Sequence, residues 1–375
     1  MTAPFSFGIE EEYFLVDAQT KAITRGAPDE FFTEVIAVAG DRVAREFLRS
    51  QIEVITPPHV DMAAARAELR ELREIVASTA ARYGMGIMAS GTHPTGTWRN
   101  QKQTEGERYD AVMDDLQMIG QRDLLCGLHV HVELDDPEKR IDVMYRVLPY
   151  LPLFIALSNS SPFWQSRRTG LMGYRLAAYD ELPRTGIPEL FRTLEEYDAY
   201  VDALVRAGVM PDASYVWWTI RPSLKHPTLE LRAADSCTNL DDAIAIAGLY
   251  RTIVHYVATH PWVNWQMDAV ARAIVVENKW RAQRYGRHGT FATADGAQTV
   301  GDRLEQIITE MGASATAVGT GTQLEHCRTI LRDGTSADRQ IAIYDDELGK
   351  GSDHTEALGA VTQWLAATTL DFRHA

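Results

Sequence analysis

Cysteine is scarce in this chain of 375 residues, and its three copies, Cys126, Cys237 and Cys327, lie far apart. No CxxC pair is present, so neither a zinc site nor a disulfide framework is indicated. A reducing compartment such as the cytoplasm is therefore expected. The first residues lead almost directly into a predicted strand, without the basic and apolar regions of a secretory signal.

Basic residues are outnumbered, with 37 Lys and Arg against 52 Asp and Glu and a formal net charge of −15. General binding to nucleic acid or to an anionic membrane needs a basic surface, so we expect neither partner. The charge still allows a local basic pocket for phosphates. No apolar run reaches the length of a membrane span, and the nearest, Leu148–Leu157, is short and contains two prolines.

Common nucleotide and hydrolase signatures are also absent. There is no GxxxxGK[ST], and Gly91–Thr97 has the glycine spacing without the lysine. No GxGxxG lies between a strand and a helix, and no GxSxG appears. An ATP-using enzyme with this sequence would therefore hold the phosphates through metal ions.

What the sequence does have is a strand-like stretch, Phe5–Val16, with three consecutive carboxylates. Because strand side chains alternate between faces, Glu10 and Glu12 share one face and Glu11 lies opposite. Two neighbouring carboxylates repel each other, so water must screen them or a cation must neutralise them. A solvated edge strand and a cation site both fit this stretch.

Further predicted strands have the same design, with one apolar face and ionisable groups on the other. The ionisable groups are Glu53 in Ser50–Thr56, then His129, His131 and Glu133 in Leu124–Leu134, then Glu230 and Arg232 in Thr228–Arg232. If these strands form one sheet, the polar faces make a concave wall suited to Mg²⁺ or Mn²⁺. Nearby arginines would neutralise a transferring phosphoryl group, and the candidates are Arg232, Arg221 and Arg175.

Each member of this set also has a simpler interpretation. The HxH pair could be an exposed polar face or make structural hydrogen bonds. Glu230 and Arg232 could form a cross-strand salt bridge on a sheet that faces water. Glu53 is more informative, because an unpaired carboxylate within an apolar strand is costly.

The remaining pattern predicts an α+β fold, with an antiparallel or mixed sheet forming a concave active-site wall backed by helices. One long helix should run from Asp61 to near Gly84, with an apolar stripe and an Arg/Glu-rich opposite face. Tyr215–Arg221 is expected to be a strand and Gly312–Gly321 a mobile loop. Without a repeat or linker, residues 1–375 are expected to form a single catalytic domain, with the mainly helical residues 240–375 packed on it.

An ordered set of blocks carries a family resemblance. The blocks are Gly8-Ile-Glu-Glu-Glu-Tyr13, Gln51-Ile-Glu-Val-Ile-Thr-Pro57, Gly91-Thr-His-Pro94, Gly127-Leu-His-Val-His131, Asn159-Ser-Ser-Pro-Phe-Trp164, Thr169-Gly170 with Arg175, Thr219-Ile-Arg-Pro222 and Thr228-Leu-Glu-Leu-Arg-Ala-Ala-Asp235. Over nearly the whole chain to about Asp235, the sequence resembles the bacterial type 2 glutamate–cysteine ligase family, or YbdK-like carboxylate–amine ligases. It departs from the family pattern at Ser166-Arg167-Arg168 and near Met172-Gly173, in a loop expected near the substrate mouth.

The resemblance implies a fold like the catalytic domain of glutamine synthetase, with ATP and Mg²⁺ (or Mn²⁺) as cofactors. The metal ligands it implies are Glu10, Glu12, Glu53, His129 and Glu230. It also implies that Arg232 contacts the phosphates of ATP or of an acyl phosphate, and that Arg221, Arg175 and His131 bind substrate or phosphate. The substrates would be a small carboxylate, such as glutamate, and an amine, and relatives suggest a homodimer.

The function expected from this is ATP-dependent ligation of a carboxylate to an amine through an acyl phosphate, including weak glutamate–cysteine ligase activity. No protein nucleophile is needed, in agreement with finding no motif for one. Two alternatives stay open. One is a metal-dependent hydrolase that uses the HxH pair, and the other is a non-catalytic nucleotide or amino-acid sensor on the same fold.

Overall fold

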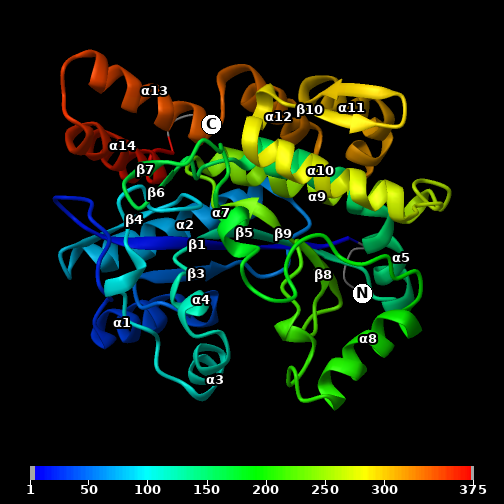
Figure 1. Ribbon diagram of the computed structural model, residues 1–375, viewed down its shortest axis with the longest axis horizontal. Coiled ribbons are helices and arrows are strands. Elements are labelled where there is room, and N and C mark those ends of the chain that lie inside the picture. The colour runs from blue at the N-terminus through cyan, green and yellow to red at the C-terminus, as the bar shows by residue number, and fades with distance from the viewer. Residues whose placement is uncertain (1–4, 373–375) are drawn as a thin grey trace.

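The computed structural model describes residues 5–372, and its central element is the long strand β1 (Phe7–Asp17). β1 lies inside a seven-stranded sheet of order β2-β3-β1-β5-β9-β8, and β4 also pairs with β1 (Figure 1). Every pairing in this sheet is antiparallel. Its other strands are β2 (Val43–Arg45), β3 (Gln51–Ile55), β4 (Met85–Met88), β5 (Gly127–Glu133), β8 (Ile220–Pro222) and β9 (Thr228–Asp235).

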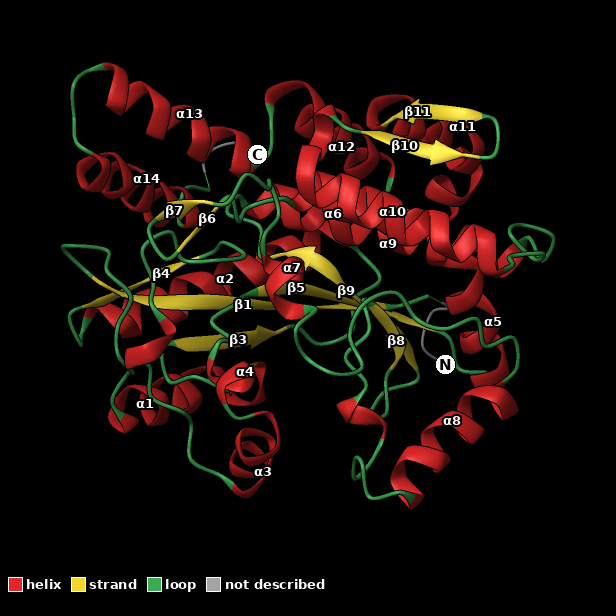
Figure 2. Ribbon diagram, viewed as in Figure 1, coloured by secondary structure: helices red, strands yellow, loops and turns green. Residues whose placement is uncertain are grey.

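Helices surround this sheet, and two small hairpins lie outside it (Figure 2). The hairpins are β6 (Phe163–Trp164) with β7 (Arg167–Arg168), and β10 (Thr290–Thr293) with β11 (Gly296–Thr299). The helices are α1 (Asp29–Ala39), α2 (Met62–Ala81), α3 (Glu107–Leu116), α4 (Met118–Gln121), α5 (Pro137–Val147), α6 (Leu151–Ser158), α7 (Arg175–Tyr179), α8 (Leu194–Arg206), α9 (Leu240–Thr259), α10 (Ala269–Tyr285), α11 (Val300–Val318), α12 (Gly321–Asp333), α13 (Ser336–Gly349) and α14 (His354–Thr369).

One face of the sheet is the main hydrophobic core. Ile9 and Tyr13 of β1 point into it together with Ile52 of β3 and Val130 of β5, and all four are fully buried. Helices α2, α5 and α9 pack against the strands of this face. Burial of these alternate side chains is the main stabilising contribution to the sheet.

The opposite face is divided into two zones along β1. Near the end of the strand, Phe14 and Val16 belong to a second, smaller core that includes Leu358 and Val361 of α14. Toward its beginning, the face carries Glu10 and Glu12 instead, and this zone is the candidate site described below.

A buried ion pair on the core face ties distant segments together. Glu11 and Arg73 of α2 are both fully buried, with Arg73 Nη2 2.7 Å from Glu11 Oε1 and Nε 3.0 Å from Oε2. The guanidinium also donates to the carbonyls of Cys237, Thr238 and Thr369. The pair is therefore fully hydrogen-bonded, which a buried ion pair needs.

The structure confirms the α+β class and the antiparallel sheet, and it corrects two local predictions. Tyr215–Arg221 is not one strand, because Ala213–Tyr215 is a 3₁₀ turn and only Ile220–Pro222 pairs with β9. Gly312–Gly321 is not a loop, because α11 continues through most of it and packs against α9 and α12. That residues 1–375 form a single domain stays a prediction.

The expectation about membrane spans also needs a correction. Pro137–Ser158 is 22 residues long and contains an 18-residue window with a mean hydropathy of 1.4, which is enough to cross a membrane by length and composition. However, 89% of this window is buried inside the fold, as is typical of the core helix of a globular protein.

Candidate active site

A row of ionisable side chains crosses five strands of the sheet on its polar face. Strand register sets Glu53 of β3 opposite Glu12 of β1, and Glu10 of β1 opposite His129 of β5. The row continues across the next pairs, where His131 of β5 faces Glu230 of β9 and Glu230 faces Arg221 of β8. Antiparallel pairing thus brings together the ionisable groups that the sequence analysis placed on separate strands.

The carboxylates and the imidazoles lie close together but do not form tight hydrogen bonds. His129 Nδ1 lies 3.4 Å from Glu10 Oε2, and its Nε2 lies 3.7 Å from Glu12 Oε1. His131 Nε2 lies 3.4 Å from Glu10 Oε1. Both Nε2 atoms are buried without a hydrogen-bond partner among the described residues, a costly state for a polar atom.

Two overlapping groups of three residues could each hold a metal ion. They are Glu10 with His129 and Glu230, and Glu12 with Glu53 and His129, and in each group the ligand atoms lie within 4.8 Å of one another. Carboxylate oxygens with one imidazole suit Mg²⁺ or Mn²⁺. The donor set and the unpartnered imidazole nitrogens fit such ions.

The electrostatics of the row depend on position. Burial alone would raise the pKa of Glu10, but the neighbouring imidazoles of His129 and His131 bring it well below its usual range. Burial raises the pKa of Glu53 well above normal, and Glu10, Glu46 and Glu12 raise it further. Burial and the neighbouring carboxylates therefore disfavour the charged form of Glu53, and a bound cation would favour it.

Glu230 is held between two arginines. Arg221 Nε donates to its Oε2 at 2.7 Å, and Arg232 Nη1 donates to its Oε1. Burial would raise the pKa of Glu230, but the two guanidinium groups lower it overall. Arg221 also donates to the carbonyls of Ser214 and Val216, so most of its donors are used within the protein.

Arg175, at the start of α7, is 2% exposed and has no carboxylate partner among the described residues. Its Nη1 donates to the carbonyls of Arg232 (3.2 Å) and Ala234 (3.1 Å), and its Nε has no partner in the part of the chain that the structure describes. Gly127 makes room for it, because a Cβ there would lie 2.2 Å from Arg175 Nη2. An uncompensated buried cation of this kind favours an anionic ligand.

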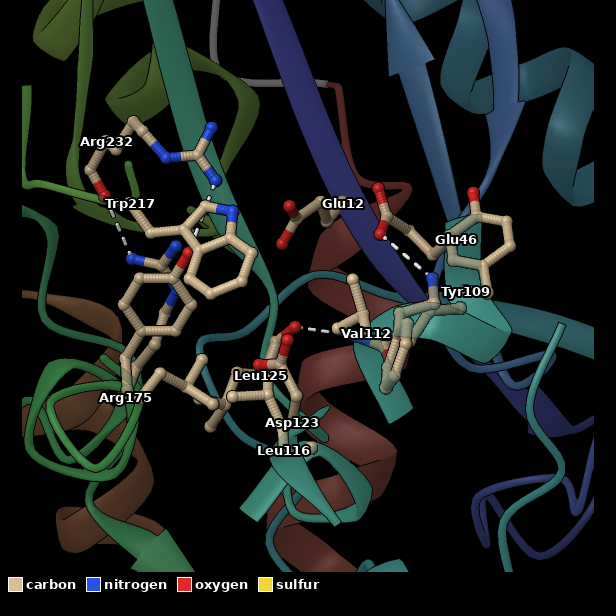
Figure 3. A pocket seen from close by; sticks show the side chains of 15 residues that line it. Glu12, Glu46, Tyr109, Val112, Leu116, Asp123, Leu125, Arg175, Trp217 and Arg232 are labelled. Carbon is tan, nitrogen blue, oxygen red and sulfur yellow. Dashed lines mark hydrogen bonds between the residues drawn. The ribbon is translucent and has the colours of Figure 1, made fainter. Parts of the chain in front are cut away.

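These arginines open onto a cavity of about 160 Å³ beside the row (Figure 3). Arg175, Arg232 and Trp217 lie on one side of it, Glu46 and Tyr109 on the other, and Glu12 projects between them. Its complete lining is Glu12, Glu46, Phe47, Gln51, Tyr109, Val112, Leu116, Gly120, Asp123, Leu125, Arg175, Tyr179, Leu182, Trp217 and Arg232.

Glu46 and Asp123 also line the cavity, although the sequence did not predict either residue there. Burial and the charge of Glu12 raise the pKa of Glu46 well above normal, and they raise the pKa of Asp123 to about 7. Both residues lie in irregular segments, after β2 and between α4 and β5, where strand periodicity gives no signal. By contrast, Arg167 and Arg168 are exposed and do not line the cavity, and Arg168 pairs with Asp345 of α13.

The comparison with solved structures defines the class of the fold. A bifunctional glutathione synthetase from Pasteurella multocida matches with a TM-score of 0.70 at 18% identity, over 99% of this chain and 53% of that one. A glutamate–cysteine ligase from Francisella tularensis in complex with AMP matches with a TM-score of 0.69 at 13% identity, over 99% of this chain and 90% of that one. The chain therefore shares the fold of these two proteins, an antiparallel sheet with helices around it.

The sequence comparison then gives the family. The model of glutamate–cysteine ligase family 2 matches residues 6–363, so the chain belongs to this family. A protein of Bradyrhizobium sp. (strain ORS 278) named "Putative glutamate–cysteine ligase 2" is 53% identical over 98% of this chain and 88% of that protein. A Rhodospirillum rubrum protein of the same name is 40% identical over 98% of this chain and 96% of its own length.

Proposed function

We propose that the chain is an ATP-dependent carboxylate–amine ligase that forms an amide bond through an acyl phosphate, including weak glutamate–cysteine ligase activity. The observation that carries this proposal is the row of carboxylates and imidazoles beside Arg232, on the fold and in the family just described. The names of the relatives and the AMP bound to the Francisella tularensis protein support nucleotide and amino-acid substrates.

The metal ligands would be Glu10, Glu12, Glu53, His129 and Glu230, and the cofactors would be ATP and Mg²⁺ or Mn²⁺. When bound, such ions lower the charge barrier between the triphosphate and an approaching carboxylate. The chain has no glycine-rich phosphate loop, so the residues of this row supply the attachment point for the phosphates.

The arginines have separate roles in this proposal. Arg232 lies at the junction of the row and the cavity, where its charge stabilises the transferring phosphoryl group. Arg221 holds Glu230 in place, and Arg175 binds an anionic group of the substrate through its free donor. His131, fixed by its hydrogen bond to Thr228 Oγ1 at 2.8 Å, binds phosphate or substrate beside Glu10.

In the first step, an oxygen of the carboxylate substrate bonds to the γ-phosphorus while the bond to ADP breaks. In the second step, the amine nitrogen bonds to the acyl carbon and phosphate leaves with the electron pair of the carbon–oxygen bond. No side chain has to act as a nucleophile. The chain orients the reactants and stabilises charge, which is the usual contribution of a protein to phosphoryl transfer.

The two alternative functions make different predictions. An HxH hydrolase of the amidohydrolase type favours a βα-barrel, whereas this sheet is antiparallel. Such a hydrolase would release product with water and without ATP. A non-catalytic sensor would bind ATP and metal and release no phosphate on addition of an amine. The cytoplasmic location and the homodimer stay predictions.

The test is a screen of amino acids and amines for ADP release by the purified protein with Mg·ATP. We expect release that depends on a carboxylate, and loss of that release in Glu10→Gln and in Glu230→Gln. Glu74→Gln, the same change at an exposed position on α2, is the matched control and should keep full activity. Full turnover in either site variant would contradict the proposed metal ligands.

A further inference from the structure

One end of the cavity gathers hydrogen-bond acceptors without matching donors. Glu46 and Asp123 both line this end, and among the described residues neither forms an ion pair (Figure 3). Within the described part of the chain, the carboxyl group of Glu46 accepts one hydrogen bond, from the backbone N–H of Phe47 at 3.2 Å. Arg232 and Arg175, the cations of the cavity, are engaged with Glu230 and with backbone carbonyls on the other side.

Gln51 gives an independent indication that a donor is missing at this place. Its side chain is 3% exposed and lines the same cavity. Its Nε2 donates to the carbonyl of Leu125, which leaves Oε1 buried without a donor. Buried acceptors in folded proteins are almost always hydrogen-bonded, so this oxygen calls for an N–H or O–H group from a ligand.

A metal ion is a poorer match for this end than an organic cation. Within the described part of the chain, both groups that bring three ligand atoms within 4.8 Å leave out Glu46 and Asp123. Acceptors that do not form such a group suit a primary ammonium group, which is larger than a bare divalent ion and carries three N–H donors.

The wall next to these acceptors is apolar. Tyr109, Val112 and Leu116 succeed one another along α3 and face the cavity, and Phe47 and Leu125 extend the same surface. A wall of this kind binds an uncharged aliphatic or aromatic body. A carboxylate at this place would instead face the oxygens of Glu46 and Asp123, which are hydrogen-bond acceptors like its own.

We propose that this end of the cavity is the subsite for the amine substrate, and that it selects a primary amine with an uncharged, apolar body over the corresponding α-amino acid. The inference rests on the proposed ligase function. It adds the chemical class of the acceptor and the residues that select it, namely Glu46, Asp123 and Gln51.

The reaction balances with Asp123 as the first proton acceptor. The bound ammonium passes one proton to the Asp123 carboxylate, and its nitrogen then bonds to the acyl carbon. The carbon–oxygen bond to phosphate breaks, and the departing phosphate takes a second proton from the nitrogen, which leaves the amide with one. Burial and Glu12 raise the pKa of Asp123 to about 7, which suits a base that works near neutral pH.

Binding to the full chain with Mg²⁺ and a non-hydrolysable ATP analogue tests the selection directly. Titration calorimetry compares tyramine with tyrosine and cysteamine with cysteine, pairs that differ only in the α-carboxylate. We expect each amine to bind about tenfold or more tightly than its amino acid. We also expect Glu46→Gln and Asp123→Asn each to weaken amine binding by about tenfold. Asp115→Asn, an exposed change on the same helix α3, should have no effect.

Equal binding of amine and amino acid, or unchanged binding in both variants, would overturn the proposed subsite. Hydroxylamine, a small and largely uncharged nucleophile, separates this outcome from a failure of the ligase function. The wild type and Asp115→Asn should form hydroxamate from an acyl phosphate, and circular dichroism shows whether the two site variants fold. If the wild type binds amines selectively but forms no hydroxamate with any carboxylate, the ligase function fails while the subsite stands.

Discussion

Neighbouring glutamates on β1 lie in two contrasting environments. Glu11, on the core face, has both carboxylate oxygens hydrogen-bonded to the buried Arg73. Glu10 and Glu12, on the other face, have only histidines and a backbone N–H as partners, and no Lys or Arg of the described residues pairs with them. The chain thus supplies its own counter-charge to the glutamate that stabilises the fold, and it leaves the opposite row to be neutralised from outside.

Breaking the buried ion pair between Glu11 and Arg73 should have the largest effect on stability. Glu11→Gln leaves Arg73 charged and fully buried, so we expect the free energy of unfolding to fall by about 3–5 kcal/mol. Urea unfolding at neutral pH measures it, with Glu74→Gln on the exposed part of α2 as the control that should stay near wild type. A loss below about 1 kcal/mol would mean that the two glutamate environments are energetically alike.

His93 sharpens the comparison, because the chain satisfies this buried group in its neutral form. Its Nε2 bonds to the carbonyl of Lys21 at 2.9 Å, and its Nδ1 accepts from the N–H of Thr95 at 3.2 Å. Burial lowers the pKa of His93 from 6.5 to about 4. Between these values the unfolded chain binds more protons, so stability is lost as pH falls through this window.

Because of His93, the free energy of unfolding should be about 3 kcal/mol lower at pH 4 than at neutral pH. Unfolding curves of the wild type and of His93→Gln, collected from pH 7 to pH 4, measure it as a difference that shrinks with falling pH. A difference that stays constant over this range would contradict the neutral burial of His93.

The uncompensated side of β1 should respond to metal. Mn²⁺ at about 100 times its dissociation constant should raise the free energy of unfolding of the wild type by about 2.7 kcal/mol. In Glu12→Gln the metal-free protein should be slightly more stable, since one repulsive charge is removed, but the gain from Mn²⁺ should be much smaller. Chelator-treated protein with and without MnCl₂ gives both values, and an equal gain in the two proteins would remove Glu12 from the ligand set.

The sequence predicted the contrast on β1 only in part. Strand alternation is local, so it correctly placed Glu10 and Glu12 together and Glu11 on the opposite face. The partner of Glu11 was not predictable, because Arg73 lies 62 residues away in a helix whose Arg/Glu-rich face seemed suited to water. Whether a guanidinium group is buried depends on tertiary contacts, which leave no periodic pattern in the sequence.

The same limit explains the other differences. Glu46 and Asp123 reach the cavity from irregular segments, where no repeat marks a face. The Gly, Ala and Thr content of Gly312–Gly321 favoured a loop, but packing of α11 against α9 and α12 outweighs that weak preference. Family resemblance supplied what periodicity could not, which is the expectation that these strands belong to one antiparallel sheet lining an active site.

The smallest effect is expected at Arg168, where charge pairing occurs in water and not inside the fold. Arg168 Nη1 lies 3.1 Å from Asp345 Oδ1, and the two side chains are 47% and 53% exposed. Because solvent screens such a pair, Arg168→Ala should change the free energy of unfolding by no more than about 0.5 kcal/mol. Carboxylate-dependent ADP release should be unchanged as well, since Arg168 does not line the cavity. A clear loss of ADP release would contradict this prediction. It would show that the segment Ser166-Arg167-Arg168, where the chain departs from the family pattern, contributes to activity although Arg168 is exposed.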